Sequence, residues 1–283
     1  MIHSTKENTT KRTTAITCVF VDIGGVLLTN GWDHHARRRA AKRFKLAWAE
    51  MEDRHQLNFA TYEDGKLTLE EYLDRVVFFQ KRPFTRAEFR RFMFAQSKPH
   101  PQMIELLRKI KTKYGLKIAV VSNEARELNA YRIRKFKLDG FVDFFVSSCF
   151  VHFHKPDADI FRLALDIAQT PARQIVYIEN TPLFVRIAED LGIRGILHKD
   201  YKSTSAKLAS FGLHVQNQRL HAEDLQRVRL HLLLVEKREV MDSFHHGVLN
   251  QSAQQKLLTD IDARLLRLES TESEKSNGQD HDK

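Results

Sequence analysis

The chain has little cysteine and no long apolar run, and both absences narrow its class. Cys18 and Cys149 are the only cysteines among 283 residues, and neither is part of a CxxC or metal-ligand spacing. Both lie inside apolar segments, so we expect buried, reduced thiols. No run approaches the roughly 18 apolar residues of a membrane span, and residues 1–14 lack the apolar stretch of a secretory signal. We therefore expect a soluble, cytoplasmic protein with no membrane partner.

Basic residues outnumber acidic ones, and the excess favours anionic partners. The sequence holds 46 Lys and Arg against 36 Asp and Glu, a formal charge of +10, which suits phosphorylated metabolites, nucleic acid or an anionic membrane surface. Many cations fall in helical patterns at 37–39 and 132–137, as on a solvated helix face. Aromatic residues within 62–94 follow helical spacing, which predicts a small helical core rather than base stacking. We therefore expect no nucleic-acid partner.

Short apolar runs alternate with helical patterns along most of the chain. Because this alternation is typical of a parallel sheet wrapped by helices, the sequence predicts an α/β fold with a Rossmann-like core and a central parallel sheet. The predicted strands are 16–21, 117–121, 141–146, 175–178 and 195–198. Between the first two strands only helical patterns occur, at 34–48, 68–79 and 85–94. They predict an all-helical cap inserted directly after the first strand.

Two further apolar stripes follow Gly212 and predict an antiparallel helical hairpin. The stripes are Leu225, Val228, Leu232 and Val235, then Leu257, Leu258, Ile261, Leu265 and Leu268, with a break near His245. The hairpin could pack onto the core or pair with a second copy, so monomer and homodimer both stay open. The predicted parts are a flexible N-terminus (1–14), the core (15–30 and 99–213), the cap (31–98), the hairpin (214–268) and a disordered tail (269–283).

Reactive side chains stand at the ends of the first two predicted strands, where open α/β sheets place their ligand crevice. Asp22 closes the first strand before a sharp turn at Gly24 and Gly25, which suits a covalent nucleophile. Ser122 and Asn123 end the second strand with a hydroxyl and an amide. Together with neighbouring N–H groups, they are suited to hold a phosphoryl oxygen.

Two later segments add a cation and metal-binding oxygens. Lys155 precedes a predicted helix and can neutralise both Asp22 and the charge that develops on a transferred group. Glu179 and Asn180 end a later strand with one carboxylate and one amide, as a metal site built on oxygen ligands requires. Each segment alone is also compatible with a helix cap or a surface charge. Their order along the chain favours one common site.

This order resembles that of the haloacid dehalogenase superfamily of hydrolases, over residues 16–213. The residues that carry the resemblance are Asp22 with the cap inserted after it, 62–68 in the cap, 122–123, 155–157 and 179–192. Within the superfamily, the chain is similar to the subgroup with a small helical cap. That subgroup includes sugar-phosphate phosphatases and the N-terminal phosphatase domain of soluble epoxide hydrolases. The resemblance implies a phosphatase acting on a small-molecule phosphate ester.

The resemblance also implies a role for each motif residue. Asp22 attacks phosphorus and forms an aspartyl-phosphate that water hydrolyses, while Lys155 pairs with the nucleophile and the phosphate. The implied phosphate-binding residues are Ser122, Asn123 and Gly25, and the implied Mg²⁺ ligands are Asp22, the backbone carbonyl of Gly24, Glu179 and Asn180. The cap excludes water and selects the leaving group.

Two positions depart from the family pattern. Gly24 stands where most members carry an aspartate that protonates the leaving oxygen, so a cap residue or a water has to supply that proton. Asn180 stands where an acidic metal ligand is usual, and a neutral amide weakens binding of a hard divalent cation. A catalytically weak or silent phosphate-binding or regulatory protein is therefore the alternative. A metal-free dehalogenase ranks below both, because the glycines after Asp22 offer no bulky side chain to shape a halide pocket.

Overall fold

The computed structural model describes the backbone of residues 16–215 and 218–277, and the side chains of 16–215 and 229–267. The first of two compact units ends at Val215 and the second begins at Gln216. The predicted flexible N-terminus (1–14) lies outside the described residues. None of the helices in the described part of the chain combines the length and the apolarity that crossing a bilayer requires.

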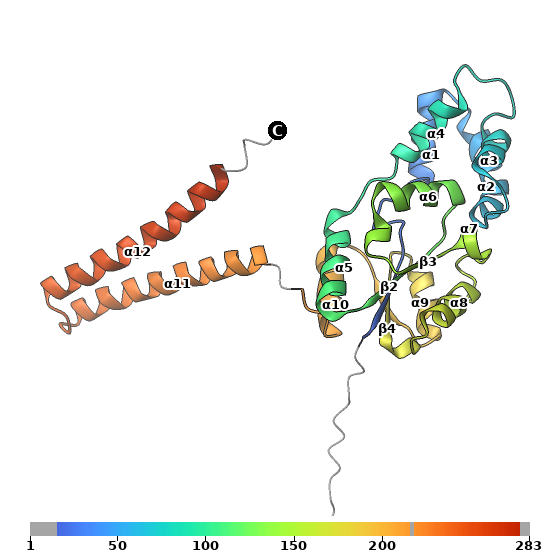
Figure 1. Ribbon diagram of the computed structural model, residues 1–283. Coiled ribbons are helices and arrows are strands. Elements are labelled where there is room, and N and C mark those ends of the chain that lie inside the picture. Colours follow the sequence, from blue (N-terminus) through green and yellow to red (C-terminus); the bar gives the residue numbers. More distant parts are fainter. Residues whose placement is uncertain (1–15, 216–217, 278–283) are drawn as a thin grey trace, which may run out of the picture. The chain divides into compact units, whose positions relative to one another are not determined.

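Five parallel strands form one sheet in the order β3-β2-β1-β4-β5, with β1 at its centre (Figure 1). The strands are β1 (Cys18–Val21), β2 (Lys117–Ser122), β3 (Phe144–Ser147), β4 (Ile175–Glu179) and β5 (Arg194–Leu197). Their central residues are mostly apolar because both faces of the sheet are buried. The predicted α/β fold with a central parallel sheet is confirmed. Strand β3 begins three residues later than predicted, because a 3-10 turn, η1 (Leu138–Gly140), precedes it.

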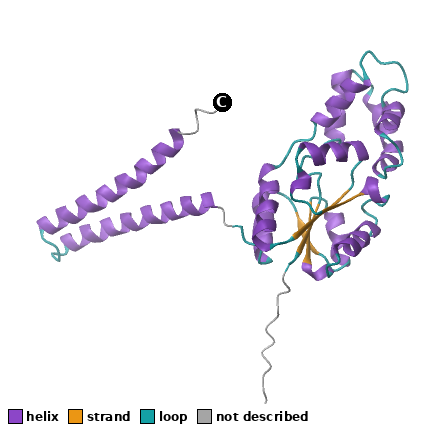
Figure 2. Cartoon of the chain, in the orientation of Figure 1, coloured by secondary structure: helices purple, strands orange, loops and turns teal. Residues whose placement is uncertain are grey.

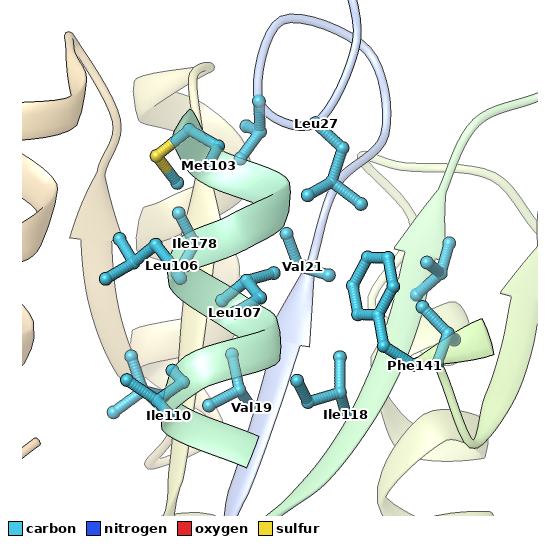
Figure 3. Close-up of a cluster of buried hydrophobic side chains, with 14 of the residues drawn as sticks. Val19, Val21, Leu27, Met103, Leu106, Leu107, Ile110, Ile118, Phe141 and Ile178 are labelled. Carbon is cyan, nitrogen blue, oxygen red and sulfur yellow. The ribbon is translucent and has the colours of Figure 1, made fainter. Parts of the chain in front are cut away.

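Helices cover both faces of the sheet (Figure 2). One face packs against α5 (Pro101–Tyr114) and α10 (Tyr201–Ser210), and the other against α8 (Asp159–Ala168) and α9 (Pro182–Asp190). Figure 3 shows the first cluster, in which Leu107 and its neighbours on α5 lie over Val19 and Val21 of β1. Helix α5 begins with Pro101 at its first turn and ends at Gly115, a left-handed residue suited to a helix C-terminus.

Both cysteines are buried and free, as expected. Cys18 lies in β1 and Cys149 in the short helix α7 (Ser148–Val151), and neither is exposed to solvent. Burial raises the pKa of each thiol to about 12, so both stay protonated at neutral pH.

The segment between β1 and β2 is helical throughout, which confirms an inserted helical cap. Ahead of α5, which packs on the sheet, four helices form the cap: α1 (His34–Phe44), α2 (Trp48–Glu63), α3 (Leu69–Val76) and α4 (Arg86–Ala95). Capping boxes begin α3 at Thr68 and α4 at Thr85, each closed by a glutamate three residues later. The first helix ends at Phe44, before the predicted residue 48, because Lys45 takes a left-handed conformation. The predicted cap boundaries, 31 and 98, stay a prediction.

The cap aromatics form a core of their own, as their helical spacing predicts. Tyr62 and Tyr72 are buried and stack with ring centroids 4.4 Å apart, and Phe89 lies in the same cluster. Leu128 of α6 (Arg126–Lys135) also joins this cluster, although α6 belongs to the core. The cap therefore packs directly on the helix that follows β2.

The two connections between cap and core run side by side. Thr29 donates its backbone N–H to the carbonyl of Lys98 (2.9 Å). Its hydroxyl donates to the carbonyl of Gln96 and accepts from the backbone N–H of Lys98. Arg132 of α6 holds both connections, because its guanidinium donates to Ser97 Oγ (3.0 Å) and to the carbonyl of Asn30 (2.9 Å).

Two arginines contradict the prediction that the basic helical patterns are solvated. Arg37 and Arg132 are 5% and 2% exposed. Arg37 makes a two-pronged contact with Glu52, at 2.6 and 2.8 Å, and Arg132 pairs with buried Glu124. Arg37 lies on the helix face of Ala36, Ala40 and Ala41, where small side chains leave room for it. A charged residue next to a stripe of alanines does not by itself show which face is buried.

The second unit contains two helices, α11 (Gln218–His245) and α12 (Gln251–Asn277), which form the predicted hairpin. Their contact involves buried Leu233, Val240 and Ile261. The predicted contacts of Leu232, Val235 and Leu257 are wrong, since these side chains are 60%, 43% and 42% exposed. Residues 230–235 are apolar except for His231, so the pattern alone leaves the buried face of α11 ambiguous.

Helix α12 continues to Asn277, into the segment 269–283 for which the composition predicts disorder. Neither proline nor glycine occurs between Gln251, where α12 begins, and Gly278, so this stretch has no residue that breaks a helix. Residues 278–283 lie outside the described residues.

Candidate active site

The predicted site residues meet at one edge of the sheet. Val21 of β1 pairs with Val120 of β2 and with Ile178 of β4. The residues that follow these strands therefore leave the sheet together. Ser122 Oγ accepts a hydrogen bond from the N–H of Ile23 (3.4 Å), and Asp22 donates its own N–H to Ile178 (3.0 Å).

Lys155 lies at the centre of this group. Its Nζ is 2.9 Å from Asp22 Oδ1, 2.6 Å from Glu179 Oε2 and 3.0 Å from the hydroxyl of Tyr177. The ammonium is fully buried among these oxygens. Asn123 fixes the backbone of Lys155 through two hydrogen bonds, of 2.8 and 2.9 Å. The amide of Asn123, predicted to contact substrate, is thus used to position Lys155.

Burial and the neighbouring charges shift the pKa values of Asp22 and Lys155. Burial raises the pKa of Asp22 to about 6, although attraction to Lys155 and a hydrogen bond from Ser122 oppose the shift. Burial also acts to lower the pKa of Lys155, but attraction to Asp22 and Glu179 outweighs it and raises that pKa. At neutral pH the nucleophile candidate is therefore a carboxylate beside a charged ammonium.

Both carboxylate oxygens of Glu179 are occupied by hydrogen-bond donors. Its Oε2 accepts from Lys155 and from Tyr177 (2.6 Å), and its Oε1 accepts from the N–H groups of Asn180 and Thr181, both at 2.9 Å. These contacts argue against Glu179 as a metal ligand and make it the anchor of Lys155. Burial raises the pKa of Tyr177 well above its usual value, so its hydroxyl stays a donor.

Tyr177 is a site residue that the sequence analysis missed. It stands two positions before Glu179 in β4, and residues two apart in a strand point to the same face. That spacing was the available signal.

The Asn180 amide lies against the turn that follows Asp22. One of its terminal atoms is 3.2 Å from the carbonyl oxygen of Gly24 and 2.8 Å from Glu179 Oε1. Both neighbours of this atom are acceptors, so it is assigned as the amide nitrogen, which donates to the Gly24 carbonyl and to Glu179 Oε1. Gly25 has φ of +76°, and a Cβ there would lie 2.2 Å from the amide, so only glycine fits.

Three oxygen ligands remain for a cation: the Asp22 carboxylate, the Gly24 carbonyl and the Asn180 amide oxygen. The last becomes available if the amide turns so that its oxygen takes the place of its nitrogen. Oxygen donors of this kind fit Mg²⁺, with one charged ligand among the three. Within the described residues, no group of three or more histidine, cysteine, aspartate or glutamate side chains could hold a metal ion.

A cavity of about 310 Å³ opens above these residues, and the cap contributes part of its lining. The core contributes Asp22, Asn123, Glu124, Arg132, Lys155, Glu179 and Asn180, and the cap contributes Arg37, Phe59, Tyr62, Glu63 and Met93. All three lining cations are already paired with carboxylates, Arg37 with Glu52, Arg132 with Glu124, and Lys155 with Asp22 and Glu179. A cavity of this size suits a small ligand.

The histidines of the cap do not line this cavity. His55 is buried and bonded to Tyr72 (2.7 Å), and burial lowers its pKa to about 3, so it stays neutral. His34 is half exposed. Asp33 caps α1 by accepting from the N–H of Ala36 (2.7 Å), as a residue in that position does. The cap histidines therefore do not replace the aspartate missing at position 24. Asp33 does line the cavity, but its carboxylate is engaged at the start of α1.

The sequence profile of the haloacid dehalogenase-like hydrolases matches residues 16–192, and the chain belongs to this family of hydrolases. It is similar to a phosphorylated carbohydrates phosphatase of Thermotoga maritima, with 26% identity over 186 residues, 64% of this chain and 85% of the relative. It is also 30% identical over 95 residues to a protein of Caldanaerobacter subterraneus assigned as the pyrophosphatase PpaX. That match spans 34% of this chain and 43% of the relative.

Solved structures share the fold. An enzyme of the family from Bacteroides thetaiotaomicron, in complex with magnesium and inorganic phosphate, has a TM-score of 0.57 and 20% identity, covering 65% of this chain and 95% of that one. A hydrolase assigned to the family from Porphyromonas gingivalis has a TM-score of 0.55 and 18% identity, covering 69% and 98%. At these identities the similarities show a shared fold.

Proposed function

We propose that the protein is a Mg²⁺-dependent phosphomonoesterase that acts on a small phosphorylated metabolite through an aspartyl-phosphate. The observation that carries this proposal is the Asp22, Lys155 and Glu179 cluster beneath a small cavity shared with the cap. The phosphatase among the relatives and the phosphate bound by a protein of the same fold support it.

Asp22 would act as the nucleophile. Its carboxylate attacks phosphorus, the bond from phosphorus to the ester oxygen breaks, and the leaving oxygen takes up a proton. Water then attacks phosphorus and releases inorganic phosphate, which restores the carboxylate. Ser122 would turn its hydroxyl hydrogen, which now hydrogen-bonds Asp22, to a phosphoryl oxygen, while its oxygen goes on accepting from Ile23.

Lys155 would hold Asp22 in place and balance charge that builds up on the phosphoryl group. Because every lining cation is already paired, the protein side chains alone leave the charge of a phosphate dianion largely uncompensated. Mg²⁺ would supply that charge and align the phosphoryl oxygens. Asp22, the Gly24 carbonyl and Asn180 would hold the ion, and ligation by Glu179 stays a prediction that its four hydrogen bonds disfavour.

The first test measures phosphate release from a generic aryl phosphate, with and without Mg²⁺. We expect release only with the ion, and none from Asp22→Asn. The matched control is Asp139→Asn, an exposed carboxyl outside the cavity, which should keep wild-type activity. Hydrolysis that survives Asp22→Asn in a folded protein would remove the nucleophile assignment.

A silent phosphate-binding protein is the second candidate, because Gly24 lacks a carboxyl and Asn180 lacks a charge. It predicts that phosphate analogues raise thermal stability while no ester is hydrolysed. The variant Gly24→Asp with Asn180→Asp would then gain activity. A Cβ at Gly24 would lie 3.2 Å from Asn30 Oδ1, so the Asn30 side chain has to move only slightly. Halide release from a haloacid would instead identify a dehalogenase.

A further inference from the structure

One cap carboxyl lines the same cavity as Asp22 and has no partner. Glu63 is the last residue of α2 and is partly buried. Its backbone carbonyl accepts from Ser148, but within residues 16–215 its carboxyl group makes neither a hydrogen bond nor an ion pair. The nearby cations cannot neutralise it, because Lys155 is engaged by Asp22 and Glu179 and Arg132 by Glu124.

The loop that follows Glu63 is fixed to the core. His154 bonds the Asp64 carboxylate (2.6 Å) and His152 bonds the Asp64 carbonyl (2.7 Å). Gly65 has φ of +70°, and a Cβ there would lie 2.3 Å from the carbonyl oxygen of Cys149, so the loop lies tightly on the core. These contacts tie Glu63 to the segment that carries Lys155. The carboxyl group is therefore held at the cavity without being used in any contact of its own.

The phosphatase reaction lacks a residue for one step. A sugar or other alkyl leaving group departs as a poor alkoxide unless its oxygen is protonated, and general acid catalysis of this kind contributes about 10²–10⁴ in rate. Gly24 cannot donate a proton, and the cap histidines do not line the cavity. Two cap carboxyls line the cavity, Asp33, which caps α1, and Glu63, which has no such contact.

We propose that Glu63 is this acid: it protonates the leaving oxygen as Asp22 attacks phosphorus, and then accepts a proton from the water that hydrolyses the aspartyl-phosphate. The inference rests on the proposed phosphatase function. In the first step the bond between Asp22 and phosphorus forms, the ester bond breaks, and the proton of Glu63 passes to the leaving oxygen. In the second step water replaces Asp22 on phosphorus and its proton returns to Glu63.

The protonation state of Glu63 supports this role. Burial raises its pKa to about 8, repulsion from Glu124, Asp22 and Asp64 adds to the shift, and Lys155 opposes it. Glu63 therefore carries a proton at neutral pH, where Asp22 is ionised. An acid and a nucleophile need opposite protonation states, and burial next to different neighbours provides them.

The test compares Glu63→Gln with wild type on two kinds of ester, an alkyl phosphate such as glycerol phosphate and an activated aryl phosphate such as 2,4-dinitrophenyl phosphate. We expect turnover of the alkyl ester to fall by about 10²–10⁴. The aryl ester needs no proton on its leaving group, so Glu63→Gln should still release a rapid burst of phenolate. The matched control is Glu50→Gln, an exposed glutamate of the same helix, which should behave as wild type.

Two further measurements separate catalysis from a structural role. The decline of wild-type activity on alkyl esters above about pH 8 should be absent in Glu63→Gln. Adding Gly24→Asp to Glu63→Gln should restore alkyl turnover, because a carboxyl returns to the usual position. Equal loss on both esters without a burst, or wild-type alkyl turnover in Glu63→Gln, would overturn the role of Glu63. Absence of any hydrolysis by the wild type would overturn the phosphatase proposal instead.

Discussion

Lys155 is the residue that allows two carboxylates to lie within one buried cluster. Asp22 and Glu179 repel each other, and without a cation between them at least one would have to bind a proton. Both oxygens of Glu179 accept two hydrogen bonds each, whereas the ammonium of Lys155 donates to only one oxygen of Asp22, Oδ1. This difference supports the proposal that Asp22 is the reactive member of the pair.

Replacing Asp22 should stabilise the metal-free protein. Its folded pKa of about 6 lies above the ordinary value of 3.8, so ionising it weakens the folded state and stability is lost as pH rises between these values. Asp22→Asn mimics the protonated form and avoids that loss. With a chelator present, we expect its melting temperature to exceed that of wild type by a few degrees at pH 7.

The same comparison near pH 3.5 serves as the control, because Asp22 is then mostly protonated in both folded and unfolded chains. The two melting curves should converge there. Asp139→Asn should show no such pH-dependent difference. A lower melting temperature for Asp22→Asn at pH 7 would contradict this prediction. It would mean that the attraction between Asp22 and Lys155 stabilises the folded protein by more than burial of the Asp22 carboxylate destabilises it.

Asn180 should set the affinity for magnesium. Asn180→Asp adds a charge where the amide faces Gly24, so the Mg²⁺ concentration that gives half-maximal activity should fall. Asn250→Asp adds the same charge at the start of α12, where Asn250 accepts from Ala253 and aspartate caps equally well. An unchanged Mg²⁺ dependence in Asn180→Asp would exclude this residue from the ion's ligands.

At the scale of elements, α6 connects the cap to the core. Its Leu128 packs in the cap cluster, and its Arg132 holds both connections through Ser97 and Asn30. The buried pair of Arg132 with Glu124 lies beside the cavity. The position of the cap over Asp22 therefore depends on one helix, together with the loop of Asp64 and Gly65.

Removing the contacts of Arg132 should lower the free energy of unfolding. Arg132→Met leaves Glu124 buried without its partner, and such losses typically amount to about 3–5 kcal/mol. Burial already raises the pKa of Glu124, so protonation should relieve part of the loss at low pH. Urea denaturation at pH 8 measures the effect.

The double variant Arg132→Met with Glu124→Met removes both charges and should recover part of the lost stability. Recovery separates the cost of the unpaired carboxylate from the loss of the hydrogen bonds to Ser97 and Asn30. If Arg132→Met alone denatures at the wild-type urea concentration, Arg132 does not brace the connections.

At the scale of the whole molecule, every residue that lines the cavity belongs to the first compact unit. A chain ending at Val215 should therefore fold and hydrolyse the same substrates with unchanged kcat/KM. Full-length protein is the comparison, and size-exclusion chromatography of both chains shows whether the hairpin joins two copies. A truncated protein that is folded but inactive would show that the second unit contributes to the reaction.

The net charge of the molecule says little about the site itself. The excess of basic residues suggests an anionic ligand, yet Arg37, Arg132 and Lys155 at the cavity are all paired. The charge available to a phosphate is therefore decided locally by which carboxylates lie beside each cation. In the proposed mechanism, Mg²⁺ and a protonated Glu63 would let this cavity accept a dianion.

The sequence by itself determined the sheet, the inserted cap and the place of Asp22, Ser122, Lys155 and Glu179. These follow from local patterns, because apolar runs form strands and the residues after parallel strands meet at one edge. It left open which face of α11 is buried, and it placed Arg37 and Arg132 in solvent, since those outcomes depend on which elements pack together.

The tertiary structure alone decided what surrounds each of those residues. It brought Glu63 of the cap to the cavity, joined Tyr177 and Lys155 to Glu179, and turned Asn180 onto Gly24. Burial and neighbouring charge then set the pKa of Asp22 and of Glu63. These effects arise between residues far apart in the chain, so no local pattern of the sequence encodes them.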